Sequence, residues 1–198
     1  MMSRMFDSSQ VNLDQLEIAT PRLLLRPVTK QDLDDFHRII TSPGVSEGTL
    51  SFPRSVDLEW ARNRLEDGIK KMRDGLCIYM HAHPREPGNH PGAVGNIGLD
   101  FIAKHNRANL GYMLDETCRG QGYATEMLTA VVDYAFDTMG MHRLCATTFT
   151  WNDASFKLLT RVGFSHEGRA RQHYYKEGEY IDAEDWGILA SDPRPWKD

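Results

Sequence analysis

The chain has 198 residues, of which 40% are hydrophobic, with a formal net charge of −5 and a sequence pI of about 5.9. This length favours one domain, since domains commonly run to ~100–200 residues, and the acidic balance argues against a nucleic acid bound by charge, which needs a basic patch. No apolar run approaches the ~18 residues of a membrane span, and no hydrophobic signal segment opens the chain, so we expect a cytoplasmic protein without a membrane partner.

The first part of the chain has two segments without periodicity and three with it. Residues 1–17 follow neither a strand nor a helix pattern and predict a mobile arm. Thr29 and Asp57 are residue types that often cap helix N-termini, and apolar residues at helical spacing follow each of them. The predicted elements are, in order, a strand over 22–26, a helix over 29–41, an irregular loop over 42–56 and a helix over 57–73.

Three apolar segments come next, separated by short connections. A loop rich in Pro and Gly over 84–92 and a turn at His105-Asn106 separate them. Strands joined by such short connections pair in antiparallel order. We therefore expect a meander of strands over 76–83, 93–101 and 108–114.

The strongest pattern lies in residues 110–139, where a short apolar strand runs into the polar turn Arg119-Gly120-Gln121-Gly122 and then into a helix. The helix has one apolar face, made of Ala124, Met127, Leu128, Val131, Val132, Ala135 and Met139. The first N–H groups of a helix have no partner within it, and its dipole favours negative charge there. Because glycines let the backbone approach a bulky anion, we predict that this turn binds a phosphate or pyrophosphate.

Spacing alone leaves other uses of this turn open. A nucleoside-triphosphatase loop needs Gly-Lys-Ser/Thr, whereas Gly122 is followed by Tyr123-Ala124. A dinucleotide fingerprint needs a third glycine, whereas Thr125 occupies that position. Both readings are disfavoured, which leaves an anion site or a tight connection that binds nothing.

The last part of the chain predicts a strand over 143–150, a helix from Asn152 or Asp153 to Arg161, and a hairpin of strands 165–176 and 180–189. Residues 192–198 are expected to form an exposed tail. A helix joins strands 108–114 and 143–149, which predicts a parallel pair inside an otherwise antiparallel sheet. The fold class is thus α/β (α+β), with one domain over 18–191 and a mixed, mostly antiparallel sheet flanked by about four helices.

Three motifs in the same order resemble the GNAT N-acetyltransferase superfamily. Arg119 to Ala124 is similar to its Arg/Gln-x-x-Gly-x-Gly/Ala pyrophosphate loop. Asn152-Asp153-Ala154-Ser155, Leu158-Leu159 and Val162-Gly163-Phe164 resemble its Asn-x-x-Ser, Leu-Leu and Gly-Phe signature. The opening Thr20 to Pro27 resembles the ribosomal-protein (Rim-type) branch. Together the motifs span residues 20–190.

The resemblance implies acetyl-CoA as cosubstrate, an amine as acceptor, and a monomer or homodimer. It also implies that the parallel strands splay apart and that the pantetheine arm lies between them, with an N–H near Met113 facing the carbonyl oxygen. The implied acetyl-CoA-binding residues are Met113, Leu114, Arg119, Gly120, Gln121, Gly122, Tyr123, Ala124, Asn152 and Ser155.

Two departures from the family pattern bear on catalysis. Many members have a tyrosine seven residues after the asparagine, where this chain has Leu159, so Ser155 is the expected proton donor to the thiolate. The Rim-type branch often has a glutamate at the position of Asn109, which cannot take up a proton at neutral pH; Asp100 is one substitute. These departures keep a second hypothesis open, an acyl-CoA sensor with little turnover.

Three further groups of side chains are candidates for a role: tyrosines and arginines near the last hairpin, a histidine pair, and the cysteines. Tyr174 and Tyr175, with Arg169 and Arg171, lie in a region that lines the acceptor side in relatives, although packing and solvation explain them equally well. His81 and His83 share a strand face but have no third ligand at fixed spacing, so no metal is expected. The odd number of cysteines, without metal-ligand spacing, predicts reduced thiols at Cys77, Cys118 and Cys145.

Overall fold

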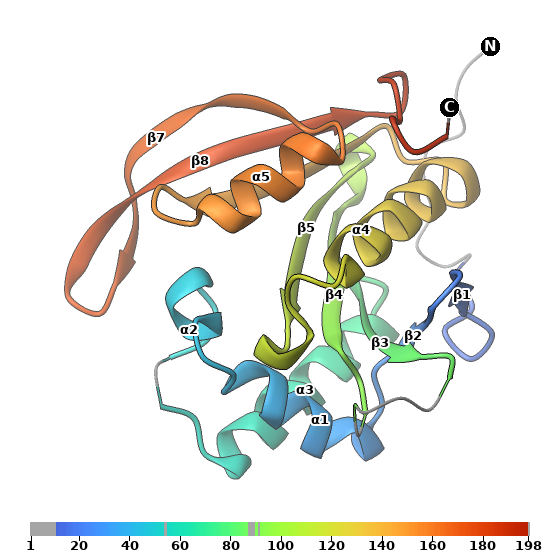
Figure 1. Ribbon diagram of the computed structural model, residues 1–198, viewed down its shortest axis with the longest axis vertical. Coiled ribbons are helices and arrows are strands. Elements are labelled where there is room, and N and C mark those ends of the chain that lie inside the picture. The colour runs from blue at the N-terminus through green and yellow to red at the C-terminus, as the bar shows by residue number, and fades with distance from the viewer. Residues whose placement is uncertain (1–10, 54, 87–89, 91, 198) are drawn as a thin grey trace.

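The computed structural model describes residues 11–53, 55–86, 90 and 92–197, which form one eight-stranded sheet in the order β1-β2-β3-β4-β5-β6-β8-β7 (Figure 1). Every neighbouring pair is antiparallel except β5 and β6. This confirms the predicted mixed sheet. The strands are β1 (Ile18–Ala19), β2 (Leu23–Pro27), β3 (Cys77–Pro84), β4 (Gly95–Ile102), β5 (Arg107–Leu114), β6 (Arg143–Phe149), β7 (Ser165–Lys176) and β8 (Glu179–Leu189).

Five α-helices flank the sheet within the described ranges: α1 (Leu33–Ile40), α2 (Val45–Gly48), α3 (Leu58–Arg73), α4 (Tyr123–Asp133) and α5 (Asp153–Arg161). The Asp57 carboxylate accepts the Trp60 N–H at 2.7 Å, so it caps α3 as predicted. The prediction that residues 42–56 are irregular throughout was wrong, because α2 lies inside them. Gly44 precedes α2 with φ +78°, a left-handed backbone that reverses the chain and starts this short turn.

The two faces of the sheet bury two separate hydrophobic clusters. On β3, Ile78 and Met80 belong to the larger cluster, which includes the apolar face of α4. Cys77 and Tyr79 belong to the other cluster, together with side chains of α1 and α3. Successive strand residues point to opposite faces, so the alternation along β3 serves both cores.

Strands β5 and β6 pair over only three residues at their N-terminal ends. The register joins Arg107 to Arg143, Ala108 to Leu144 and Asn109 to Cys145, and it stops there. Beyond this point β5 stays paired with β4, and β6 stays paired with β8. The two strands therefore separate toward their C-terminal ends, as expected for a splayed pair, and the N-terminus of α4 lies at the open side (Figure 1).

Both predicted chain ends need correction. In the arm predicted over 1–17, residues 1–10 lie outside the described residues, but Leu16 is buried and Val11 and Leu13 pack against the larger core. The tail predicted as exposed over 192–198 is fastened as far as it is described. Arg194 forms ion pairs with Asp133, the last residue of α4, and with Asp137 in the π-helical turn Tyr134–Thr138 that follows, and Trp196 packs against the core. Apolar residues in both ends drive this docking.

None of the helices in the described residues is both long and apolar enough to span a lipid bilayer.

Candidate active site

The predicted anion turn has open backbone at the head of α4. Gly120 and Gly122 have φ values of +75° and +82°, a region that other residues rarely adopt. Gly122 is the N-cap of α4, and no side chain caps the helix there. A Cβ placed on Gly120 would have no atom within 4 Å. The first N–H groups of α4 are therefore accessible to an anion.

Arginine side chains surround this turn. The guanidinium of Arg119 donates to the Pro43 carbonyl at 2.6 Å and so ties the turn to the loop before α2. Arg22 donates to the Gln121 carbonyl at 2.9 Å, and it pairs with Glu126 at 2.6 Å. The sequence pattern missed Arg22 as a site residue, although it lies inside the recognised Thr20–Pro27 motif.

A first cavity of about 400 Å³ extends from this turn to the gap between β5 and β6, and we call it the donor cavity. It brings together every predicted acetyl-CoA-binding residue except two. Gln121 instead donates its side-chain amide to the Thr117 carbonyl at 3.0 Å, and Tyr123 packs on the larger core beneath Arg22. The predicted residues that line it are Met113, Leu114, Arg119, Gly120, Gly122, Ala124, Asn152 and Ser155, and Arg161 of α5 joins them.

Asn152 caps the N-terminus of α5 and also lines the donor cavity. Its Oδ1 accepts the Ser155 N–H at 3.1 Å, which makes it the N-cap of α5. Its Nδ2 faces α2, since a Cβ on Gly48 would lie 3.1 Å from it. The cap uses the carbonyl side of the amide and leaves the NH₂ side toward the cavity.

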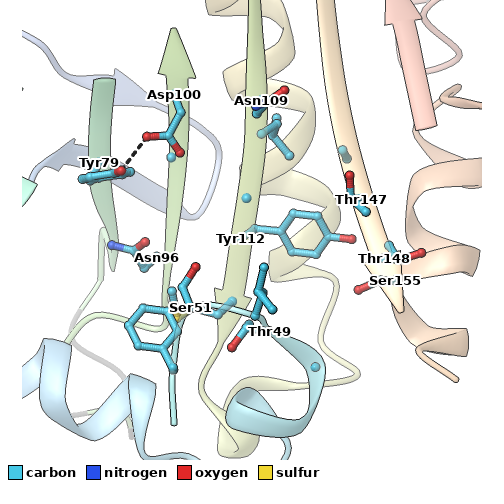
Figure 2. A pocket seen from close by; sticks show the side chains of 18 of the residues that line it. Thr49, Ser51, Tyr79, Asn96, Asp100, Asn109, Tyr112, Thr147, Thr148 and Ser155 are labelled. Atoms are coloured by element: carbon cyan, nitrogen blue, oxygen red, sulfur yellow. Dashed lines mark hydrogen bonds between the residues drawn. The ribbon is translucent and has the colours of Figure 1, made fainter. Parts of the chain in front are cut away.

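A second cavity of about 450 Å³ lies over the other end of the splayed strands, and we call it the acceptor cavity. Three cross-strand pairs of β4 and β5 form its floor: Asn96 with Met113, Gly98 with Gly111, and Asp100 with Asn109. Figure 2 shows Asn96, Asp100 and Asn109 on these two strands. The ring of Tyr79 covers Gly98, where a Cβ would lie 2.4 Å from it. At Gly111 no atom lies within 4 Å of such a Cβ, so the middle of the floor is open.

Two charged side chains line the acceptor cavity within the described part of the chain. Asp100 is its one carboxylate, and Tyr79 donates its hydroxyl to Oδ1 of Asp100 at 2.6 Å. Burial and this hydrogen bond raise the pKa of Tyr79. Arg64 of α3 is its one guanidinium and has no ion pair with a described residue. Arg64 therefore lies at a cavity wall and not only in bulk solvent.

The two cavities meet in the gap between β5 and β6. The residues that line both are Gly48, Thr49, Tyr112, Met113, Asn152 and Ser155. Figure 2 shows the Tyr112 ring extending from β5 toward β6, with its hydroxyl near Ser155. Burial raises the pKa of Tyr112 to about 12, and the neighbouring Ser155 side chain offsets this in part. Sequence reasoning missed Tyr112, although the Gly-Tyr pair of the central strand marks it.

Of the remaining residues singled out from the sequence, some line the acceptor cavity and others lie outside both cavities. Asn109 lies on the floor of the acceptor cavity, and Leu159 is fully buried beside the same cavity and brings no hydroxyl. Tyr174 also lines the acceptor cavity, whereas Tyr175 is 63% exposed and packs against Tyr180. Arg169 pairs with Glu184 at 2.5 Å, and no contact in the described part brings Arg171 to either cavity.

Two groups of side chains with metal-ligating atoms within 4.8 Å of one another occur in the described ranges, and both are next to an arginine. Asp32 joins His81 and His83, but its carboxylate accepts two hydrogen bonds from Arg26, at 2.6 and 2.9 Å. The second group, His90, Asp115 and Cys118, has Arg38 donating to Asp115. A guanidinium in contact with the carboxylate opposes a second cation there. That the protein binds no metal stays a prediction.

A family profile described as an acetyltransferase (GNAT) domain matches residues 22–165, more than half of the chain. The chain belongs to the GNAT acetyltransferase family. This acetyltransferase is 30% identical over 177 residues to YoaA, an uncharacterized N-acetyltransferase of Bacillus subtilis, with 87% of this chain and 96% of the relative covered. It is 25% identical over 166 residues to AaaT, an L-amino acid N-acetyltransferase of Escherichia coli, with 81% and 94% covered.

Among solved structures, the acetyltransferase is similar to RimL, a ribosomal-protein alpha-N-acetyltransferase, with a TM-score of 0.78 at 21% identity. The match covers 88% of this chain and 94% of RimL. RimL in complex with coenzyme A gives a TM-score of 0.77. The predicted family, the mixed fold and N-acetyltransferase activity are confirmed by these comparisons, and the Rim-type proteins are among the relatives.

Proposed function

We propose that this acetyltransferase moves an acetyl group from acetyl-CoA directly to a primary amine while both substrates are bound. The observation that carries the proposal is the meeting of the donor and acceptor cavities at Tyr112, Met113, Asn152 and Ser155. Direct attack needs the amine nitrogen and the thioester carbon within about 3–3.5 Å of each other. Two cavities that share a wall permit this contact.

The donor cavity fits acetyl-CoA through three features of its lining. The uncapped N–H groups from Gly120 to Ala124 are suited to the pyrophosphate, and Arg119, Arg22 and Arg161 add positive charge around it. The edge of β5 beyond Asn109 has no strand partner in β6, so its backbone is free to bind the amides of the pantetheine arm. The N–H of Met113 or Leu114 is placed to stabilise the charge that develops on the carbonyl oxygen.

In this proposal Asp100 accepts the proton that the amine loses. It is the one carboxylate among the described residues of either cavity, and it pairs across the sheet with Asn109, the position where the Rim-type branch often has glutamate. The separation along β4 between Asp100 and the Asn96–Met113 pair is four residues, roughly 13 Å at strand spacing, so a water chain links it to the amine. The hydrogen bond from Tyr79 holds the carboxylate in place.

Replacing Asp100 with asparagine tests this role. Loss of a general base commonly costs 10²–10⁴-fold, so kcat of Asp100→Asn should fall about 100-fold with the affinity for acetyl-CoA unchanged. Tyr79→Phe, which loosens the carboxylate without removing it, should have a smaller effect. An Asp100→Asn enzyme with wild-type kcat at every pH would exclude Asp100 as the base.

We further infer that the acceptor is a small amine that carries a carboxylate, such as an α-amino acid. Arg64 supports this, because it brings to a cavity of about 450 Å³ a guanidinium that has no ion pair within the described ranges. The L-amino acid specificity in the name of the relative AaaT agrees with this class. A protein N-terminus, the substrate class named for RimL, is the competing acceptor.

A matched pair of arginine variants tests the acceptor class. A charge-assisted hydrogen bond contributes about 1.5–3 kcal/mol, so Arg64→Ala should raise KM for an amino acid about 10-fold or more. It should leave KM for the corresponding amine without a carboxylate unchanged. Arg62→Ala, on α3 but outside both cavities as described, is the control and should change neither. Equal effects on both substrates, or turnover confined to peptide N-termini, would contradict the amino-acid acceptor.

The second candidate function is an acyl-CoA sensor with little turnover. Asn109 and Leu159 favour it, because neither position offers the acid or base that relatives use. Initial-rate kinetics with a panel of amines separate the two functions. Intersecting patterns for both substrates and thiol release support direct transfer, whereas tight CoA binding without thiol release from any amine supports the sensor.

A further inference from the structure

The Tyr112 hydroxyl is a buried polar group without a hydrogen-bond partner in the described part of the chain. Unsatisfied buried hydroxyls are uncommon in folded proteins because burial removes their hydrogen bonds to water. Tyr112 lines both cavities, and its ring places this hydroxyl in the gap where they meet (Figure 2). A ligand atom that accepts a hydrogen bond there would satisfy it.

The neighbours of Tyr112 restrict what that ligand atom is. Ser155 lies on the opposite side of the gap, at the start of α5 (Figure 2). Thr148 of β6 is also near, but its hydroxyl already accepts the Trp186 indole N–H at 3.1 Å. Leu159, one turn after Ser155 on α5, contributes only apolar atoms. Thr49 also lines both cavities, but its hydroxyl donates to the Val45 carbonyl at 2.8 Å. Among the described residues that line both cavities, Tyr112 and Ser155 are thus the hydroxyl groups that remain as donors to a ligand.

We propose that Tyr112, together with Ser155, donates a hydrogen bond to the sulfur of coenzyme A and so stabilises the departing thiolate, for which Leu159 offers no polar group. The inference rests on the proposed acetyl-CoA function. Tyr112 comes from β5, the strand before the anion turn, whereas Leu159 comes from α5. The Tyr112 hydroxyl of β5 thus takes the role that the apolar Leu159 of α5 cannot fill.

The proton balance follows from the acidities of the groups. As the C–N bond forms, the C–S bond breaks and its electron pair stays on sulfur. A thiol has an ordinary pKa near 8.5, well below that of the buried Tyr112 hydroxyl, at about 12. Tyr112 therefore keeps its proton and stabilises the thiolate by donation. The proton that completes the thiol is one that the amine loses on becoming an amide, relayed through Asp100 and solvent.

The first test measures binding without turnover. Tyr112→Phe keeps the ring in the gap and removes only the hydroxyl. A hydrogen bond to the charged form lowers the pKa of a thiol, so the pKa of the thiol of bound CoA, followed by thiolate absorbance, should rise by about one unit in Tyr112→Phe. Tyr112→Phe should also weaken CoA binding at high pH, where bound sulfur is thiolate, but leave binding of CoA lacking its sulfur atom unchanged.

The second test uses the leaving group. Tyr112→Phe should lower kcat about 10- to 100-fold with acetyl-CoA, and by less with an acetyl thioester whose thiol is more acidic, because a better leaving group needs less stabilisation. Tyr134→Phe is the matched control, since Tyr134 is half-buried, has a pKa raised by burial, and lines neither cavity as described. It should change none of these values.

The outcomes separate this inference from the proposed function. An unchanged thiol pKa and an equal loss for all thioesters in Tyr112→Phe would overturn the role of Tyr112 while leaving acetyl-CoA binding intact. Failure of the wild-type protein to bind CoA would instead overturn the proposed function. Combining Tyr112→Phe with Ser155→Ala should give less than the product of the two single losses, because both hydroxyls act on one sulfur atom.

Discussion

Two glycines of the site have different reasons for lacking a side chain. Gly122 needs its backbone conformation, since its φ of +82° strains any residue with a Cβ. Gly111 has ordinary φ and open space instead, so a side chain there would fill the acceptor cavity without straining the chain. One glycine therefore serves the donor and the other the acceptor.

Substituting valine at each glycine should separate the two substrates. Gly122→Val should weaken acetyl-CoA binding about 10-fold or more, because strain of about 1–3 kcal/mol displaces the turn that holds the pyrophosphate. Gly111→Val should raise KM for the amine and leave acetyl-CoA affinity within about twofold. Calorimetry gives the affinities, and thermal unfolding checks that both variants fold. Wild-type acetyl-CoA affinity in Gly122→Val would place the pyrophosphate elsewhere.

At the scale of elements, the sequence predicts what depends on local periodicity. The meander of β3, β4 and β5, the crossover through α4 and the glycine turn follow from hydrophobic spacing and residue type, and they agree with the structure. Contacts between distant segments are less accessible. Nothing in the α3 pattern shows that Arg64 turns into a cavity, and Asp32 approaches His81 from almost fifty residues away. Such contacts depend on how elements pack, which a one-dimensional pattern does not contain.

The start of α5 combines a structural and a binding role in Asn152, and two substitutions should separate them. Asn152→Ala removes the cap and the amide NH₂, so it should lower the free energy of unfolding by about 1 kcal/mol and also weaken CoA binding. Asn152→Ser keeps a hydroxyl that caps a helix comparably well, so stability should stay within a few tenths of a kcal/mol. CoA binding should weaken in both. If Asn152→Ser binds CoA like the wild type, the side-chain amide only caps the helix.

At the scale of the whole molecule, β3 carries a buried histidine that links folding to pH. His81 is fully buried, its ring stacks on Phe36, and neither ring nitrogen has a partner among the described residues. Burial lowers its pKa from 6.5 to about 4, and the like charges of protonated His83 and Arg26 act in the same direction, against the carboxylates of Asp32 and Asp35. The folded protein therefore keeps His81 neutral at neutral pH.

This buried ring predicts a loss of stability in mild acid. Between pH 6.5 and about 4 the unfolded chain binds a proton at residue 81 that the folded chain does not, so the free energy of unfolding falls as pH falls through this window. From pH 7 to pH 5 the loss is about 2 kcal/mol for His81, and it is absent above the window. Asp32, whose pKa is lowered to about 2 by hydrogen bonds from Arg26 and Thr29 that outweigh its burial, contributes only below pH 3.8.

Denaturant unfolding at several pH values tests the assignment with His81→Met, which has no titrating group and a side chain suited to an irregular core site. Between pH 7 and pH 5, the free energy of unfolding should fall by about 2 kcal/mol less in the variant than in the wild type, whatever the variant's stability at pH 7. His105→Gln is the control, because His105 lies exposed in a surface turn and should leave the difference unchanged. Since His83 is half-buried and also has a pKa lowered by burial, part of the dependence should persist in His81→Met. An unaltered difference in His81→Met would mean that acid unfolding begins elsewhere in the fold.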